Sequence, residues 1–161
     1  MNDFKVPSKI EIVKGDIRDR KIVDELGSKA DIIIQTAAQI NVKKSIEDPV
    51  YDADNNINGT LNLLEAARKS DIGRFIYISS AAVYGDPITL PIKLWESFNK
   101  RRGMRHTPIP HKARFRFINE EHPTNPLSPY GLSKLTGEKY TRLYCRLYEL
   151  PVVCLRPFNI F

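Results

Sequence analysis

Arg74-Phe-Ile-Tyr-Ile-Ser-Ser80 decides the fold of this chain, because an apolar run of strand length ends there in two hydroxyl side chains. Such a run is typical of a buried strand in a parallel sheet. Open α/β sheets bind their ligands at the carboxyl ends of the strands. We therefore expect Ser79 and Ser80 to lie at the edge of a sheet, where a substrate would bind.

Segments on both sides of this strand alternate between strand and helix patterns. Apolar residues at helical spacing around Ile57 and Leu64 predict a helix before it. Alternating or continuous apolar runs predict further strands at 9–15, 30–38 and 152–155, and helix-forming residues predict helices at 18–26 and 132–150. This succession predicts an α/β fold with a doubly wound parallel sheet.

The long helix opens with Ser128-Pro-Tyr130-Gly-Leu-Ser-Lys134, in which Ser128 is the expected N-cap and Pro129 the first helical residue. Tyr130 and Lys134 are four residues apart, so one helical turn places them on the same face. A lysine ammonium held near a phenol favours the phenolate, which makes Tyr130 a candidate general base. This spacing also arises by chance on helical surfaces. The serines at the strand end strengthen its interpretation as part of a functional site.

Three motifs occur in order: Ser80-Ala-Ala-Val-Tyr-Gly85, Ser128-Pro-Tyr-Gly-Leu-Ser-Lys134 and Leu155-Arg-Pro-Phe-Asn-Ile160. Together they resemble the extended short-chain dehydrogenase/reductase family, and within it the NAD-dependent sugar-nucleotide epimerases of the UDP-glucose 4-epimerase type. The resemblance implies a Rossmann-like fold, NAD as the cofactor and a nucleotide sugar as the substrate. It also implies a homodimer for full-length relatives.

The resemblance implies three catalytic residues. Tyr130 would exchange the proton of a sugar hydroxyl, Ser80 would hydrogen-bond the same oxygen, and Lys134 would hold the cofactor ribose. Ala81 and Ala82 stand where dehydratases of the family need an acid and a base, so the sequence favours epimerisation over dehydration.

Further binding residues follow from the resemblance alone. Cofactor contacts are expected from Asp16, Ile17, Ala37, Ala38, Asn56 and Ser79 in addition to Tyr130 and Lys134, and substrate contacts from Ser80, Tyr130 and Asn159. Several of these have a structural alternative, because Asp16 could cap a turn, Ala37 and Ala38 could serve packing, and Asn56 could be a solvated helix residue. Pro157 stands where some members carry a tyrosine that touches nicotinamide, so that contact is not expected.

The glycine loop of a dinucleotide-binding unit is missing from the sequence. None of the glycines forms a Gly-x-x-Gly-x-x-Gly type spacing, which lets backbone N–H groups approach a pyrophosphate. The chain begins at what resembles the approach to the family's third strand and stops before its substrate lobe. We therefore expect residues 1–161 to form a partial NAD-binding domain that lacks the first βαβ half and the C-terminal substrate lobe. Alone, it should be marginally stable and bind NAD weakly or not at all.

A basic insertion at residues 93–117 interrupts the family pattern. It carries eight Lys and Arg residues against one acid, Glu96, and so accounts for the formal net charge of +6. Aromatic residues among these cations would suit nucleic acid, although an unselected surface loop is the simpler interpretation. His106 and His111 have no neighbouring cysteine or acidic cluster, so no metal site is predicted.

The remaining composition indicates a soluble cytoplasmic protein, because the sequence has no apolar run of membrane-spanning length and no signal-peptide pattern. Cys145 and Cys154 are then expected as buried thiols in a reducing compartment. Three functional hypotheses stay open: an NAD-dependent sugar-nucleotide epimerase, a catalytically inactive fragment of such an enzyme, or a basic-loop module that binds nucleic acid.

Overall fold

Three strands form one parallel sheet in the computed structural model, which describes residues 10–86 and 118–158. They are β1 (Ile32–Gln35), β2 (Arg74–Ile78) and β3 (Val152–Leu155), in the order β1-β2-β3. The register aligns Ile33 with Phe75 and Phe75 with Val152. The predicted α/β fold with a parallel sheet is confirmed.

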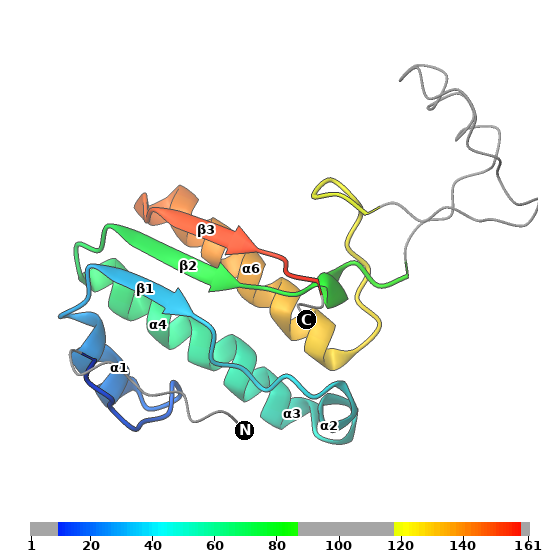
Figure 1. Ribbon diagram of the computed structural model, residues 1–161, viewed down its shortest axis with the longest axis horizontal. Helices are drawn as coiled ribbons and strands as arrows, with labels where there is room; N and C mark the ends of the chain where they lie inside the picture. Colours follow the sequence, from blue (N-terminus) through cyan, green and yellow to red (C-terminus); the bar gives the residue numbers. More distant parts are fainter. Residues whose placement is uncertain (1–9, 87–117, 159–161) are drawn as a thin grey trace, which may run out of the picture.

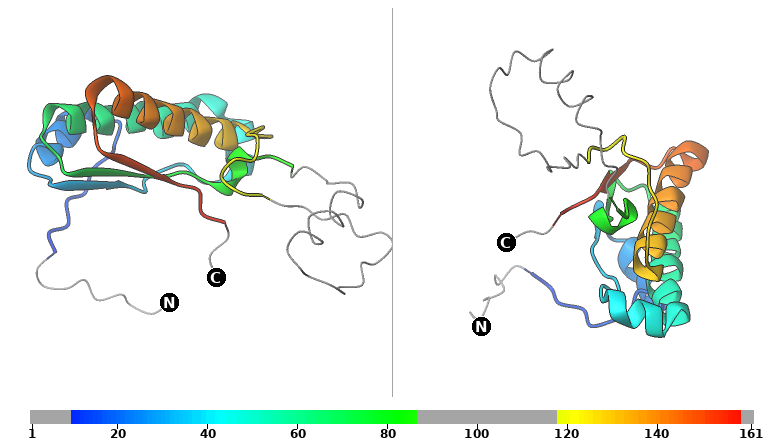
Figure 2. Two further views of the ribbon diagram at one scale, coloured as in Figure 1. Left: turned by 90° about the horizontal axis from the view of Figure 1, so that it is seen from above. Right: turned by 90° about the vertical axis from the view of Figure 1, so that its right-hand side faces the viewer.

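Helices cover one face of this sheet, as the two further views in Figure 2 make plain. The described residues thus supply one helical layer of the doubly wound arrangement (Figure 1). In chain order, the helices and turns are α1 (Arg20–Gly27), α2 (Val42–Glu47), α3 (Pro49–Ala53), the π-helical turn η1 (Asp54–Asn58), α4 (Gly59–Lys69), the 3-10 turn η2 (Ala81–Val83) and α6 (Pro129–Tyr148).

The start of α6 is fixed by its capping residues. Ser128 has an extended backbone and its Oγ accepts a hydrogen bond from the Gly131 N–H at 3.1 Å, while Pro129 occupies the first turn. This confirms the predicted N-terminus of the helix. Tyr130 and Lys134 consequently lie in its first two turns.

The core lies between the sheet and the helical layer. Phe75 and Tyr77 point from β2 into this layer and are fully buried, together with Leu64 and Ala67 of α4. Burying one large apolar side chain contributes about 1.5–3 kcal/mol. This cluster therefore holds α4 against the strand that leads to Ser79.

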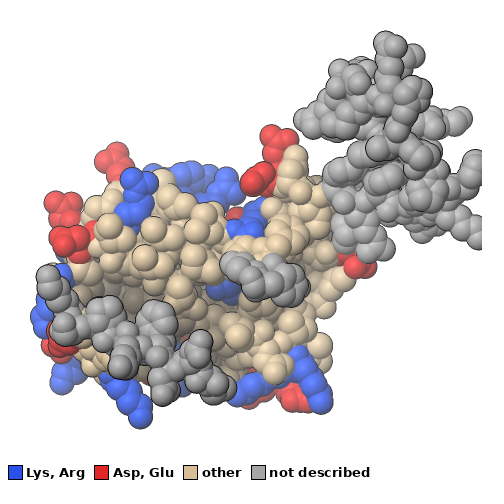
Figure 3. Space-filling view, viewed as in Figure 1, with Lys and Arg blue, Asp and Glu red and all other residues tan. Residues whose placement is uncertain are grey.

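The opposite face of the sheet is open over the residues that the structure describes. Ile32 and Ile34 of β1 are 57% and 59% exposed, and Leu155 of β3 is 47% exposed. Figure 3 views the molecule from this side, and the visible part of the face is mostly uncharged, with charged side chains gathered at its rim. No described strand pairs with the outer edge of β1.

The strand predicted at 9–15 is wrong for its described part, since residues 10–16 form neither strand nor helix. Ile10 and Ile12 are 56% and 72% exposed. An extended segment becomes a strand only when a neighbouring strand takes up its backbone hydrogen bonds, and no described strand does so here. The sequence reasoning also missed the helices α2 and α3, which lie between β1 and Asn56.

The part of the chain that the structure describes contains no helix long and apolar enough to cross a membrane. The basic insertion at 93–117 and Asn159 lie outside the described residues.

Candidate active site

Ser80, Tyr130 and Lys134 line one cavity of about 570 Å³ at the carboxyl ends of the strands. The structure thus brings together three residues that are separated by up to 54 positions in the sequence. The cavity is completed by residues that follow the three strand ends: Thr36, Ala38, Ile40, Val42, Ile78, Ser79, Ala81, Ala82, Pro157 and Phe158.

The turn after β2 brings Ser80 close to the start of α6. Ser80 caps η2, and its Oγ accepts a hydrogen bond from the Ala82 N–H at 3.1 Å. A Cβ on Gly131 would lie 2.7 Å from the Ala82 carbonyl oxygen, so a glycine is needed for α6 to begin this close. The hydroxyl of Ser80 and the phenol of Tyr130 therefore face the same cavity.

Lys134 is buried to 4% exposure and forms no ion pair with any described residue. Its Nζ lies 4.6 Å from the centroid of the Tyr77 ring, a distance that permits a cation–π contact. Burial lowers the pKa of the Lys134 ammonium from 10.5 to about 8, and the negative charge of Asp52 acts in the opposite direction. The cavity therefore contains an amine that can change its charge close to neutral pH.

The two serines at the end of β2 have different partners. Ser79 is buried, and its Oγ donates a hydrogen bond to Glu138 Oε2 at 3.2 Å. The hydroxyl hydrogen of Ser80 has no acceptor among the described residues, because its one recorded hydrogen bond uses the oxygen as acceptor. Ser80 is consequently the serine whose hydroxyl is available to a ligand.

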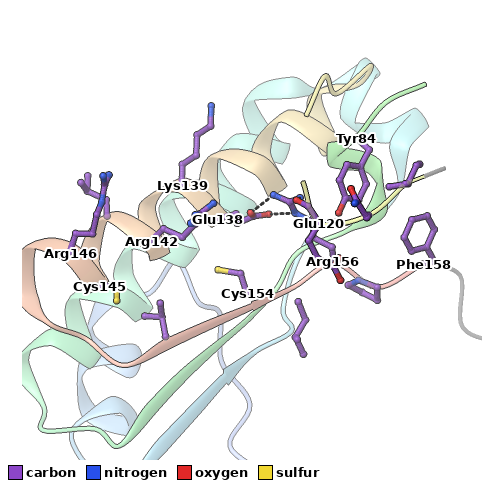
Figure 4. A pocket seen from close by; sticks show the side chains of 16 residues that line it. Tyr84, Glu120, Glu138, Lys139, Arg142, Cys145, Arg146, Cys154, Arg156 and Phe158 are labelled. Atoms are coloured by element: carbon purple, nitrogen blue, oxygen red, sulfur yellow. Dashed lines mark hydrogen bonds and ion pairs between the residues drawn. The ribbon is translucent and has the colours of Figure 1, made fainter. Parts of the chain in front are cut away.

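A second, larger cavity of about 1400 Å³ runs between α6 and the outer edge of β3 (Figure 4). Glu138 and Arg156 reach toward each other inside it, with Tyr84 beside the guanidinium. It shares only Pro157 and Phe158 with the smaller cavity and contains none of Ser80, Tyr130 and Lys134. The catalytic residues predicted from the sequence therefore belong to the smaller cavity.

Asn56 is fully buried, and its carboxamide is occupied by protein partners. Its Oδ1 accepts from the Gln39 N–H at 2.8 Å, and its Nδ2 donates to the Gln39 carbonyl at 2.9 Å and to Ser133 Oγ at 3.0 Å. Asn56 thereby fixes the segment after β1, which includes Ala38, against α6. Ala38 lines the cavity, and Ala37 does not.

Ile17 lies against Gly59 at the start of α4, and neither Asp16 nor Ile17 lines the cavity. Asp16 pairs with Arg18 at 2.7 Å, and this guanidinium lowers the pKa of the Asp16 carboxyl to about 2. The Asn62 amide donates to the Ile17 carbonyl at 3.1 Å. The structure therefore does not bring these two predicted residues together with the catalytic ones.

Sequence reasoning missed two buried carboxylates near the cavity, Asp52 and Glu138, which are 1% and 4% exposed. Glu138 follows Lys134 by four residues, and this spacing on one helix face was a usable signal. Asp52 lies in the five-residue helix α3 and offered no comparable signal. Among residues 10–86 and 118–158, no group of three or more His, Cys, Asp or Glu side chains is arranged to hold a metal ion.

Comparison with known proteins identifies relatives along almost the whole chain. Residues 2–161 match the family described as the NAD dependent epimerase/dehydratase family. A protein of Methanocaldococcus jannaschii with the provisional name UDP-glucose 4-epimerase is 41% identical over 99% of this chain. A UDP-glucose 4-epimerase of Mycolicibacterium smegmatis is 34% identical over 95% of it.

Solved structures give the same picture. The crystal structure of a UDP-glucose 4-epimerase from Brucella ovis in complex with NAD superposes with a TM-score of 0.71, at 34% identity over 91% of this chain. The chain spans 45% and 41% of the lengths of the two sequence relatives and 38% of the Brucella chain.

Proposed function

Because this chain belongs to the NAD dependent epimerase/dehydratase family, we propose that it carries the catalytic residues of an NAD-dependent epimerase for nucleotide sugars. The substrate class is that of the relatives named UDP-glucose 4-epimerase. The observation that supports the proposal most strongly is the shared cavity of Ser80, Tyr130 and Lys134. Residues 1–161 would then be part of an NAD-binding domain, and the insertion at 93–117 would be a loop of it.

One observation indicates that the residues of the cavity fit the nicotinamide end of a dinucleotide. The cavity combines a buried amine, Lys134, with the small side chains of Ala38, Ala81 and Ala82, which leave room for a flat ring and a ribose. The sequence has no glycine loop for the pyrophosphate. NAD, when bound, supplies the ability to take a hydride from a sugar carbon and to return it to the opposite face.

Tyr130 is the proposed acid and base of the reaction. As a phenolate it would take the proton of the sugar hydroxyl, and as a phenol it would give the proton back after the carbon is inverted. The Ser80 hydroxyl would donate a hydrogen bond to the same sugar oxygen and stabilise the charge that develops on it. Lys134 would bind the cofactor ribose and stabilise the phenolate.

Inversion without net redox change distinguishes this proposal from dehydration. A dehydratase must also protonate a leaving hydroxyl and remove a proton from the neighbouring carbon. Ala81 and Ala82 line the cavity next to Ser80 and cannot transfer protons. Epimerisation is therefore the proposed reaction.

The test joins a binding measurement to an activity measurement on the 161-residue chain. NADH is titrated while nicotinamide fluorescence is followed, and the conversion of UDP-glucose to UDP-galactose is assayed on the same sample. Saturable binding with turnover that Tyr130→Phe reduces by about 100-fold or more would support the proposal. Turnover that survives Tyr130→Phe undiminished would contradict it.

A second candidate is a catalytically inactive fragment of such an enzyme, favoured by the absence of a glycine loop from the 161 residues. It predicts no NADH binding by this chain, with binding restored when a glycine-loop βαβ unit is grafted to its N-terminus. The nucleic-acid alternative depends on residues 93–117, outside the described residues. Salt-dependent retention by DNA that disappears on their deletion would support it.

A further inference from the structure

Asp52 is a charged residue in the interior that the proposed reaction does not use. It lies on α3 and is 1% exposed. Its Oδ1 accepts from Gln39 Nε2 at 2.9 Å and from Asn56 Nδ2 at 3.2 Å. Its Oδ2 has no hydrogen-bond partner among the described residues. An ionised oxygen left in this way is costly unless a positive charge nearby compensates for it.

The hydrogen bonds of Asn56 connect this carboxylate to the helix of the cavity. The two hydrogens of Asn56 Nδ2 are shared among three acceptors, the Gln39 carbonyl, Asp52 Oδ1 and, at 3.0 Å, Ser133 Oγ. Ser133 immediately precedes Lys134. The Ser133 hydroxyl in turn donates to the Tyr130 carbonyl at 3.0 Å. A continuous polar path therefore runs from α3 to the turn of α6 that carries both proposed catalytic residues.

Lys134 is the matching cation, and it forms no ion pair with another described residue. Three groups on the elements around it carry or acquire charge: Asp52 from α3, the Tyr77 phenol from β2 and the Tyr130 phenol from its own helix. Burial raises the pKa of Tyr77, so this phenol is neutral near pH 8. Asp52 is then the acidic group whose charge opposes the effect of desolvation on the pKa of Lys134.

We propose that Asp52 is a positioning residue, the buried counter-charge of Lys134, joined to its helix by the Asn56–Ser133 bridge. It keeps an ammonium inside a cavity wall that would otherwise favour a neutral amine. Its value to catalysis rests on the function proposed for Lys134. The charge coupling between Asp52 and Lys134 does not depend on that function, because it is measured without cofactor or substrate. A failure of the coupling can therefore be distinguished from a failure of the proposed function.

The test is a pH titration of Lys134 in the 161-residue chain labelled with ¹³Cε-lysine, in which the Lys134 signal is assigned from its loss in Lys134→Met. The wild-type midpoint is expected at about 8. Asp52→Asn should lower it by roughly one pH unit, because a nearby opposite charge is lost at nearly constant shape. Asp54→Asn is the matched control, since this carboxylate pairs with Arg18 on the exterior, and it should leave the midpoint unchanged.

An unchanged midpoint in folded Asp52→Asn would overturn the proposal, as would an equal fall in Asp54→Asn. If Asp52→Asn does not fold, the coupling is measured in a second variant at the same position. The second variant is Asp52→Ser, which also removes the charge and keeps an oxygen that can accept from Gln39 and Asn56, and it should lower the Lys134 midpoint as well. An unchanged Lys134 midpoint in folded Asp52→Ser would also overturn the proposal.

Discussion

Glu138 on α6 and Arg156 after β3 form a bidentate, largely buried ion pair. Arg156 Nη2 lies 2.5 Å from Glu138 Oε1, and Arg156 Nε lies 2.9 Å from Glu138 Oε2. Their side chains are 5% and 15% exposed. Glu138 also accepts the hydrogen bond of Ser79, so the pair joins the helix of the cavity to the ends of β2 and β3.

Breaking this pair from one side should destabilise the fold strongly. Arg156→Met leaves the Glu138 carboxylate buried without its cation, and we expect a loss of about 3 kcal/mol in the free energy of unfolding. The measurement is urea unfolding at pH 7. Lys29→Met breaks the exposed pair with Glu25 and should change stability by less than about 1 kcal/mol. Equal effects of the two substitutions would contradict the buried geometry.

Gly137→Ala should destabilise α6, although alanine is the better helix former by about 1 kcal/mol. A Cβ at this position would overlap the Tyr77 hydroxyl, and such overpacking costs about 1–3 kcal/mol. The same substitution in a Tyr77→Phe background removes the nearest atom and should cost less. Thermal unfolding of the four chains of this cycle checks the coupling, and purely additive effects would argue against the contact.

Lys134 should make stability depend on alkaline pH. Its folded pKa of about 8 lies below its ordinary 10.5, so between these values the unfolded chain binds more protons than the folded one. The destabilisation is fully present below pH 8 and is relieved as the pH rises toward 10.5. The stability of the wild type relative to Lys134→Met should therefore rise across this window, by on the order of 2–3 kcal/mol. Urea unfolding at several pH values measures it, and a flat difference would refute the prediction.

The two cysteines should differ in reactivity. Burial raises the pKa of the Cys154 thiol to about 11. The burial predicted for Cys145 is wrong, because this residue lies on an exposed part of α6. Since the thiolate is the nucleophile, iodoacetamide at pH 8 should alkylate Cys145 roughly tenfold faster or more. Mass spectrometry of peptides over time gives both rates, with chain denatured in urea as the control in which they converge. Faster labelling of Cys154 in the folded chain would show that this strand is accessible.

Sequence patterns predicted the helices and strands that are encoded by adjacent residues. The apolar run of β2, the run of β3 and the Ser128-Pro129 start of α6 were each confirmed by the structure. A cap or a buried run is encoded in adjacent residues, so it can be read from the chain directly. The strand predicted at 9–15 was wrong because pairing depends on a neighbour that no local pattern reveals.

The candidate site, too, was predicted from the sequence in part and decided by the tertiary structure in part. The sequence determined which residues have the chemistry, since a tyrosine and a lysine one helical turn apart and a serine at a strand end are visible in the printed chain. Only the tertiary structure decided that Ser79 donates its hydroxyl hydrogen to Glu138, 59 residues away, whereas the Ser80 hydroxyl donates to no described residue. Only the tertiary structure placed Asp52 and Asn56 beneath the Lys134 helix, because burial and charge compensation are properties of packed elements and not of neighbouring residues.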